Sequence, residues 1–330
     1  MVVAATEPAG ASGRVLRLAT RSSAQATAQA IVVADALMSA HSGLTVELVF
    51  VDTLGDRRTD VPLHTIGGQG VFVKEVQRAV LRGHADLAAH SAKDLPSADA
   101  DGLMLAAFCE RRDPRDALVG ATFAELPPGA TVATGSVRRR AQLTRVRADL
   151  RFVELRGNIH TRLSKLPEGG ALVMAVAALQ ILGLTERIAE RLPVDEFVPS
   201  PGQGCVAVEC RRGDDEVVAL LSAVDHPATR AAVLLERAFL AELGTGCSLP
   251  IAAHAAGDLL TGFLAEPSSN LHVMKSIVLV GDSGARLAQA RALARQLHAE
   301  VAAGSADAGT RATGTDVEAG TDVDAGTEGC

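Results

Sequence analysis

Four short loops combine hydroxyl groups or amides with a cation, and each stands between an apolar, strand-like stretch and the start of a helical pattern. They read ATRSS at 19–23, HSAKD at 90–94, ATGSVRR at 133–139 and LRGN at 155–158. Helix N-termini attract anions through free N–H groups and the helix dipole. One such loop would mean little, because Ser and Thr are ordinary N-caps. Four of them predict a cleft that binds several carboxylates or phosphates.

Asp94 is the acid within one of these basic loops. A carboxylate in a positive cleft can stabilise a cationic intermediate and transfer protons. A structural role is the alternative, in which Asp94 caps a helix or pairs with neighbouring Lys93. The position of Asp94 alone does not decide between the two.

The five cysteines are scattered, which argues for reduced thiols and against a disulfide framework. Cys247 ends the glycine-rich stretch GTGC at 244–247, where an exposed thiol could serve in covalent attachment; an ordinary loop cysteine is an equal alternative. Cys109, Cys205 and Cys210 are expected to pack as small buried side chains. No Cys pair or His spacing suits a metal, so no metal site is expected.

Charge is distributed unevenly along the chain. The formal net charge is −7, and residues 304–330, a repetitive sequence of Ala, Gly, Thr and acids, contribute −5 of it. Such a composition cannot bury a core, so this tail is expected to be disordered. From Arg138 to Lys165, by contrast, the sequence has eight arginines and one lysine but only two acids, Asp149 and Glu154. This local excess of +7 indicates an anionic partner, although a solvated helix face accounts for part of it.

The aromatic content separates two kinds of anion. Proteins that bind single-stranded nucleic acid stack bases on aromatic side chains, whereas this chain has no Trp, no Tyr and eight Phe. Nucleic acid is therefore not an expected partner. Arginine forms bidentate pairs with carboxylates, which suits a chain with 28 Arg and 4 Lys, although genomic base composition could produce the same bias.

Membrane and export segments are not expected. No apolar run approaches the ~20 residues of a membrane helix. Residues 1–10 lack the basic start of a secretory signal. These observations predict a soluble, cytoplasmic protein, and we expect it to act as a monomer.

The apolar pattern predicts a mostly parallel α/β arrangement that occurs twice. Strands are expected at 14–20, 45–53 and 85–90, then at 131–134, 151–155 and 171–177, with helices after them. The first helix begins near Ser23 and is expected to bury Ala24, Ala28, Ile31, Ala34 and Met38. Pro and Gly clusters at 127–128 and 199–202 are hinge candidates.

The fold class is therefore α/β, with two α/β lobes, a smaller third α+β domain and a disordered acidic C-terminal tail. The expected first domain is discontinuous, 14–110 plus 207–226, because a strand at 205–210 could return to the first unit. The second domain covers 111–206. The third, 227–303, holds a helix from Pro227, an antiparallel sheet at 259–280 and a helix at 284–303, and the tail is 304–330.

Eight collinear segments resemble the porphobilinogen deaminase (hydroxymethylbilane synthase) family. The segments are LRLATRSS at 16–23, GGQGVFVKE at 67–75, ADLAAHSAKDLP at 85–96, RRDPRDALVG at 111–120, ATGSVRRRAQL at 133–143, RGNIHTRLSKL at 156–166, PGQGCVAVECR at 201–211 and ERAFLAELGTGCSLPIAAHA at 236–255. The resemblance covers roughly residues 14–303. The order and spacing of the eight segments are stronger evidence for the resemblance than any single motif.

The resemblance implies a transferase of heme and porphyrin biosynthesis. Members condense four porphobilinogen molecules head to tail into hydroxymethylbilane, a linear tetrapyrrole, and release four ammonia molecules. The chain grows on a covalently bound dipyrromethane cofactor, held by a thioether to a loop cysteine, and Cys247 matches that cysteine. Each pyrrole carries an acetate and a propionate, so the growing oligopyrrole is a polyanion that needs a cleft lined by arginines.

The resemblance also implies roles for single residues. Asp94 matches the catalytic aspartate, which interacts with pyrrole N–H groups and stabilises the cation formed on loss of ammonia. The expected cofactor-binding set is Cys247, Ser91, Lys93, Asp94, Thr134, Ser136, Arg138, Arg139, Arg162 and Gln203. The expected substrate-binding set is Arg21, Ser23, Gln29, Arg156 and Arg162.

Four positions depart from the pattern of the family. Gly135 stands where Ser is common, Gln69 where Lys is frequent, Ala178 in place of a usual Gly and Ile181 in place of a usual Arg. Two rival hypotheses stay open. Two lobes of this periplasmic-binding-protein-like kind also occur in non-catalytic solute binders and effector sensors. A relative that has lost its catalytic activity is the second, because Gly135 and Ile181 each remove a potential contact to an anion.

Overall fold

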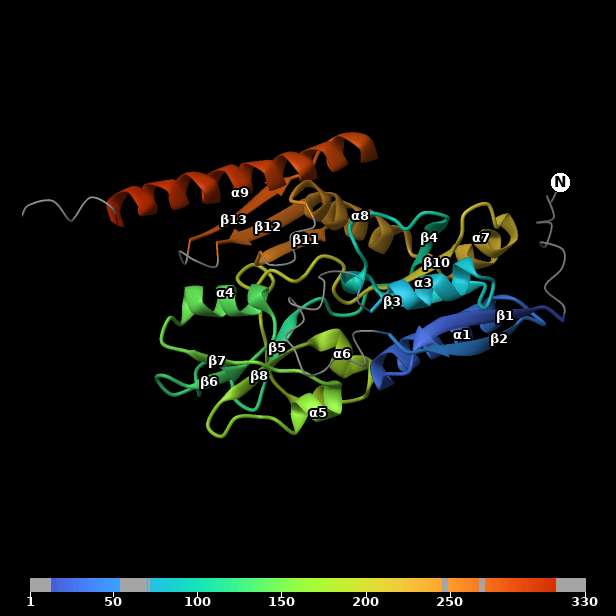
Figure 1. Ribbon diagram of the computed structural model, residues 1–330, viewed down its shortest axis with the longest axis horizontal. Coiled ribbons are helices and arrows are strands. Elements are labelled where there is room, and N and C mark those ends of the chain that lie inside the picture. The colour runs from blue at the N-terminus through green and yellow to red at the C-terminus, as the bar shows by residue number, and fades with distance from the viewer. Residues whose placement is uncertain (1–12, 54–69, 71, 245–248, 267–270, 313–330) are drawn as a thin grey trace, which may run out of the picture.

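The computed structural model describes residues 13–53, 70, 72–244, 249–266 and 271–312, with side chains up to residue 305. Three sheets lie within these ranges: two of five strands and one of three. Figure 1 shows the two larger sheets as separate lobes, with the third sheet and the long helix α9 (Ser283–Ala312) above them. This arrangement confirms the predicted class of two α/β lobes with a smaller third domain.

The first lobe is built on a sheet of strand order β2-β1-β3-β10-β4. Its strands are β1 (Val15–Arg21), β2 (Thr45–Val51), β3 (Leu87–Ser91), β4 (Leu103–Phe108) and β10 (Val206–Arg211). Helix α1 (Ala24–Ala40) covers one face through a core that includes Val33 and Leu37, and α3 (Lys74–Leu81) covers the other. Helix α7 (Asp215–Leu221) packs beside α1 in the first core.

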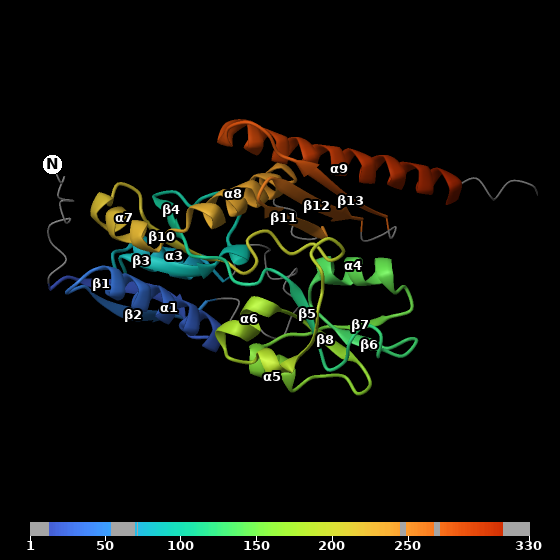
Figure 2. The ribbon, with the colours of Figure 1, turned by 180° about the vertical axis from the view of Figure 1, so that it is seen from behind.

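The second lobe repeats this plan in the order β7-β6-β8-β5-β9. Its strands are β5 (Asp116–Val119), β6 (Thr131–Ala133), β7 (Arg151–Val153), β8 (Ala171–Ala175) and β9 (Ile188–Arg191). Helix α4 (Val137–Val146) covers one face of the sheet. Helices α5 (Ile159–Leu163) and α6 (Val176–Ile181) cover the other, and both views place α6 beside α1 of the first lobe (Figure 2).

Two crossover segments, 109–115 and 192–205, connect the lobes, and each delivers an antiparallel strand. Strand β5 follows the first crossover and lies antiparallel between β8 and β9. Strand β10 follows the second crossover and lies antiparallel between β3 and β4. In each sheet the other four strands all run in one direction, opposite to the inserted strand, so their carboxyl ends meet at the edge that faces the other lobe.

The third domain is a three-stranded antiparallel sheet covered by two helices. The strands are β11 (Ile251–Ala256), β12 (Leu259–Ala265) and β13 (His272–Val278), and the helices are α8 (Pro227–Glu242) and α9. Pro227 begins α8 with its fixed φ, as expected at a first helical position. Phe239 and Leu297 lie in the core between helices and sheet. The opposite face of the sheet packs through Phe263 near Ala141 of α4.

Several predictions about elements need correction. Helix α1 buries Ala30, Val33, Ala34 and Leu37, whereas Ala24, Ile31 and Met38 are exposed, because the sheet contacts a face rotated from the predicted one. The proline pair at 127–128 lies between β5 and β6 inside the second lobe, not between lobes. Strands β4, β5, β9 and β11 were not expected. Helix α9, expected to end at 303, continues to Ala312, so residues 304–312 of the tail that was expected to be disordered are helical, although Gly304 and Gly309 lower the helix propensity there.

Within the described residues, no single helix is both long and apolar enough to cross a membrane. Two consecutive helices, Asp215–Val224 and Pro227–Glu242, meet the criteria of length and composition when they are taken together, but the chain bends by 106° between them. The same part of the chain holds no cluster of His, Cys, Asp and Glu that could bind a metal ion.

Candidate active site

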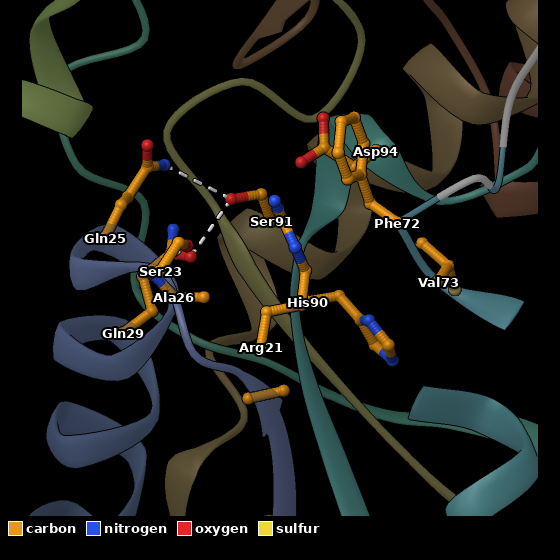
Figure 3. A pocket seen from close by; sticks show the side chains of 11 residues that line it. Arg21, Ser23, Gln25, Ala26, Gln29, Phe72, Val73, His90, Ser91 and Asp94 are labelled. Carbon is orange, nitrogen blue, oxygen red and sulfur yellow. Dashed lines mark hydrogen bonds between the residues drawn. The ribbon is translucent and has the colours of Figure 1, made fainter. Parts of the chain in front are cut away.

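Asp94 lines a pocket at the carboxyl edge of the first sheet. It closes the single 3₁₀ turn that follows β3, η2 (Ala92–Asp94), and its carboxylate points into the pocket (Figure 3). Arg21 comes from the end of β1 and Phe72 from the turn before α3, and the Arg21 guanidinium lies 4.2 Å from the centre of the Phe72 ring. The pocket therefore combines one acid, one cation and an aromatic face.

On the side of the pocket opposite Asp94, hydrogen bonds link three polar side chains (Figure 3). The Ser91 hydroxyl donates to Gln29 Oε1 at 3.0 Å, and Gln25 Nε2 donates to Ser91 Oγ at 3.5 Å. Ser23 caps α1, because its Oγ accepts from the Ala26 N–H at 3.4 Å. Gln25 was not among the expected site residues, although its position four residues before Gln29 places both amides on one helix face.

His90 precedes Ser91, but its ring points away from these groups (Figure 3). Alternation along β3 sends it to the opposite face of the sheet, where Nε2 lies 3.0 Å from Glu209 Oε2. Gln77 of α3 donates to both oxygens of that carboxylate at 3.0 Å. This buried cluster fixes α3 on the sheet beneath the pocket.

The second lobe contributes the loop 134–139. Thr134 is buried, and its Oγ1 accepts from the Ser136 N–H at 3.2 Å. Ser136 caps α4, since its Oγ accepts from the Arg139 N–H at 3.4 Å. Arg138 and Arg139 therefore project from the first turn of a helix whose N-terminus faces the cleft, which confirms the predicted start of this helix.

Both arginines of this turn contact Asp116, a buried residue at the start of β5. Arg138 Nη1 donates to Asp116 Oδ2 at 2.7 Å, and Arg139 Nη2 donates to Asp116 Oδ1 at 2.7 Å. Burial alone would raise the pKa of Asp116, but the charges of Arg138 and Arg139 outweigh it and hold this pKa well below its usual range. Asp116 was not among the expected site residues.

Lys93 and Gln203 meet between the lobes. Lys93 Nζ donates to Gln203 Oε1 at 3.2 Å, which links the first lobe to the second crossover. Burial lowers the pKa of Lys93 to about 8, and the nearby charge of Arg139 acts in the same direction. A lysine held this way is an ammonium ion at neutral pH and has N–H groups left for an anion.

Arg162 on α5 lies close to charged side chains of both lobes. Its Nε donates to the Gly157 carbonyl oxygen at 2.7 Å. Burial lowers the pKa of Arg162 to about 10, and its charge interacts with Arg139, Asp94, Arg156 and Arg21. Residues of both lobes therefore share one electrostatic environment around Asp94. The cations outnumber the acids there, so the site suits a ligand with several carboxylates.

Two predicted site features lie outside the described residues: Cys247, within 245–248, and Gln69. Of the other cysteines, Cys205 and Cys210 are buried and Cys109 is half-buried, and all three are free thiols. Burial raises the pKa of Cys109 and of Cys210 to about 11. These thiols are therefore poor nucleophiles at neutral pH, in line with the packing role expected for them.

The structure gives a physical reason for the departure at Gly135. A Cβ at Gly135 would lie 2.9 Å from the Leu155 carbonyl oxygen and 3.0 Å from Glu154 Oε2, so the space of a larger side chain is already filled. Ala178 is buried in the core beneath α6. Ile181, which ends α6, is only partly buried.

The fold and this cleft define a two-lobed α/β protein in which cations of both lobes lie close to Asp94. Two family models match the chain: "Porphobilinogen deaminase, dipyromethane cofactor binding domain" over residues 16–219 and "Porphobilinogen deaminase, C-terminal domain" over 230–300. The chain belongs to the porphobilinogen deaminase family.

Curated relatives agree with this assignment. The porphobilinogen deaminase of Roseiflexus castenholzii is 50% identical over 245 residues, 73% of this chain and 81% of that protein. That of Geobacter sulfurreducens is 46% identical, covering 79% of this chain and 85% of that protein. That of Syntrophotalea carbinolica is 45% identical over 305 residues, 90% of this chain and 95% of that protein. Among solved structures, the methionine binding protein MetQ is 16% identical with a TM-score of 0.41, covering 64% of this chain and 89% of that chain.

Proposed function

We propose that this chain is an active hydroxymethylbilane synthase. It condenses four porphobilinogen molecules into hydroxymethylbilane and releases four ammonia molecules, on a dipyrromethane primer joined to Cys247 by a thioether. The observation that carries the proposal is the placement of Asp94. Its carboxylate faces a pocket in the first lobe, and its charge interacts with cations of the second lobe.

Asp94 performs the electrostatic part of the reaction. When the aminomethyl C–N bond of porphobilinogen breaks, ammonia leaves with the electron pair and the pyrrole becomes a methylene-pyrrolenine cation. Asp94 stabilises that cation through the pyrrole N–H and accepts or relays the proton lost later. At about 4 Å and an effective dielectric constant near 20, two opposite unit charges interact by about 4 kcal/mol, which is a large part of a catalysed barrier.

The dipyrromethane, when bound, supplies the free α-carbon that forms the new C–C bond. The described residues fit such a group, because several buried cations converge where its acetates and propionates would lie. In this proposal the cofactor carboxylates are held by Ser91, Lys93, Thr134, Ser136, Arg138, Arg139, Arg162 and Gln203, with Asp94 at the pyrrole N–H groups. The incoming substrate is held by Arg21, Ser23, Gln29, Arg156 and Arg162.

The domain division belongs to the same proposal. The first lobe with its returning strand β10 supplies the acid and the substrate pocket, the second supplies the basic loop, and the third, 227–303, carries the attachment cysteine. We further infer a cytoplasmic monomer without a nucleic-acid or membrane partner. The absence of Trp and Tyr from the sequence supports the exclusion of a nucleic-acid partner.

Intact mass of the purified protein tests the proposal. We expect the native chain to exceed its amino-acid mass by one dipyrromethane, and Cys247→Ser to lose this excess while Cys330→Ser keeps it. A non-catalytic binder would weigh only what its sequence predicts, even after incubation with porphobilinogen. An inactive relative would carry the adduct and yet release no further ammonia when it is given porphobilinogen.

A further inference from the structure

Asp116 accepts four N–H groups in the interior of the protein. Oδ1 accepts from Arg139 Nε at 3.0 Å, from Arg139 Nη2 at 2.7 Å and from Gln203 Nε2 at 2.9 Å, while Oδ2 accepts from Arg138 Nη1 at 2.7 Å. The residue is 1% exposed. No ligand oxygen can approach a carboxylate so enclosed, so Asp116 acts on the cleft only through its three partners.

The first partner, Gln203, is held in one orientation. Its Nε2 donates one hydrogen to Asp116 and the other to the Pro114 carbonyl oxygen at 2.8 Å. Both amide hydrogens are thereby used, and Oε1 must face the other way, where it accepts from Lys93 Nζ at 3.2 Å. Asp116 therefore determines where the Lys93 ammonium lies, although the two residues belong to different lobes.

The other two partners keep part of their donor capacity. A guanidinium has five N–H groups. Arg139 uses three, two toward Asp116 and one toward the Val173 carbonyl oxygen, and Arg138 uses two, toward Asp116 and the Val198 carbonyl oxygen. Within the described residues this leaves two N–H groups on Arg139 and three on Arg138, in fixed directions. Because Asp116 anchors Arg139 by its Nε and Nη2 edge and Arg138 by Nη1, a ligand would bind both guanidinium groups without further ordering them.

We propose that Asp116 is the positioning residue of the anion site: it orients Arg138 and Arg139 directly and Lys93 through Gln203, so that all three hold the carboxylates of the dipyrromethane primer. The inference deepens the proposed function and rests on it. Lys93, Arg138, Arg139 and Arg162 outnumber Asp94 and Asp116 by two positive charges in this cluster. A buried excess of positive charge is costly unless an anion joins it, so the cluster is arranged for a ligand rather than for stability alone.

The sign of the effect of Asp116→Asn separates positioning from simple charge balance. Removing a negative charge makes the cleft more positive, so charge alone predicts that porphobilinogen and the primer bind more tightly. Loss of positioning predicts weaker binding in spite of the added positive charge. We expect primer-free Asp116→Asn protein, produced in cells that make no porphobilinogen, to need roughly 10- to 100-fold more porphobilinogen for half-maximal formation of the covalent adduct.

Intact mass measures this covalent uptake of porphobilinogen directly, without a measurement of steady-state product release. Asp113→Asn is the matched control, because it removes the same charge from a carboxylate three residues away that pairs with Arg115 at 2.6 Å. We expect the control to take up the primer like the native protein. Equal or tighter uptake by Asp116→Asn would overturn the inference. Failure of the native protein to form an adduct would instead refute the proposed function, so the two failures are distinguishable.

Gln203→Met keeps the inference testable if Asp116→Asn does not fold. The substitution removes the link to Lys93 and leaves the pairing of Asp116 with both arginines in place. Because Gln203 Oε1 stabilises the charged form of Lys93, its loss lowers the pKa of Lys93, and uptake of the primer should fall off at lower pH than in the native protein. A pH profile identical to that of the native protein would show that Gln203 does not relay the position of Lys93.

Discussion

Arg111 Nη1 lies 2.6 Å from Glu236 Oε1, and this ion pair joins the first crossover to helix α8. Glu236 is fully buried and also accepts the Gly202 N–H of the second crossover at 2.7 Å and the Ala255 N–H of β11 at 2.9 Å. One carboxylate therefore anchors both connections between the lobes to the third domain. Any change in lobe orientation must take place around this point.

Glu236→Gln should destabilise the protein strongly. Arg111 would lose the charge that compensates its burial, which costs about 3–5 kcal/mol when one member of a buried pair is removed. Chemical denaturation measures the loss. Glu242→Gln is the control on the same helix, because Glu242 pairs with the exposed Arg295 and should contribute less than about 1 kcal/mol. Equal losses in the two variants would contradict the anchoring role.

Asp94→Asn should leave the fold intact and reduce turnover. The residue lies at the rim of a pocket rather than in a core, so the midpoint of thermal unfolding should shift by less than about 2 °C. Loss of electrostatic stabilisation typically costs a factor of about 10²–10³ in kcat. Release of ammonia, measured in the steady state, gives the rate. A variant that retains near-native kcat would remove Asp94 from the mechanism.

The low pKa of Lys93 predicts an alkaline limit to substrate and primer binding. Burial and the charge of Arg139 place this pKa at about 8, so the ammonium that binds carboxylates is lost as pH rises through 8. Bound carboxylates favour the protonated form of Lys93. The alkaline limb of the pH profile, where the kinetic parameter falls with rising pH, should therefore lie near pH 8 for kcat/KM and at higher pH for kcat. Lys93→Arg should abolish the limb, and Lys275→Arg, on the far domain, should keep it.

Gly135→Ser should strain the basic loop. The new Cβ would meet a backbone oxygen at 2.9 Å, and overpacking of this kind costs about 1–3 kcal/mol. Thermal unfolding measures the cost. Gly284→Ala, near the start of α9, would place its Cβ at an ordinary contact distance of 3.4 Å from Asp282 Oδ1 and should instead stabilise the protein by less than about 1 kcal/mol. A stabilised Gly135→Ser protein would show that Glu154 and Leu155 yield readily.

The sequence predicted the site best where chemistry and topology coincide. Residues 19–23 and 90–94 end neighbouring parallel strands, so Arg21, Ser91 and Asp94 had to meet at one sheet edge. The start of α4 at Ser136 followed from the same pattern. These inferences need only strand order and helix caps, which are properties of short segments.

Pairings between distant segments could not be predicted in this way. Asp116 has Arg115 beside it in the sequence, and nothing in the spacing shows that it pairs with Arg138 and Arg139 instead. That choice depends on β5 lying antiparallel to β8, with its first residue under the turn that begins α4. The buried face of α1 was mispredicted for a similar reason, because packing against the sheet, not hydrophobicity alone, selects the face.

The place of β10 in the first sheet has a consequence for how the chain is made. Strand β4 has β10 as its sheet neighbour, and β10 ends at Arg211, after the whole second lobe. During synthesis on the ribosome, the amino-terminal lobe emerges first. More than ninety residues separate β4 from β10, and all of them must be synthesised before β4 can pair with β10 in the sheet. The nascent lobe that carries Asp94 is therefore completed only after the basic lobe has left the exit tunnel.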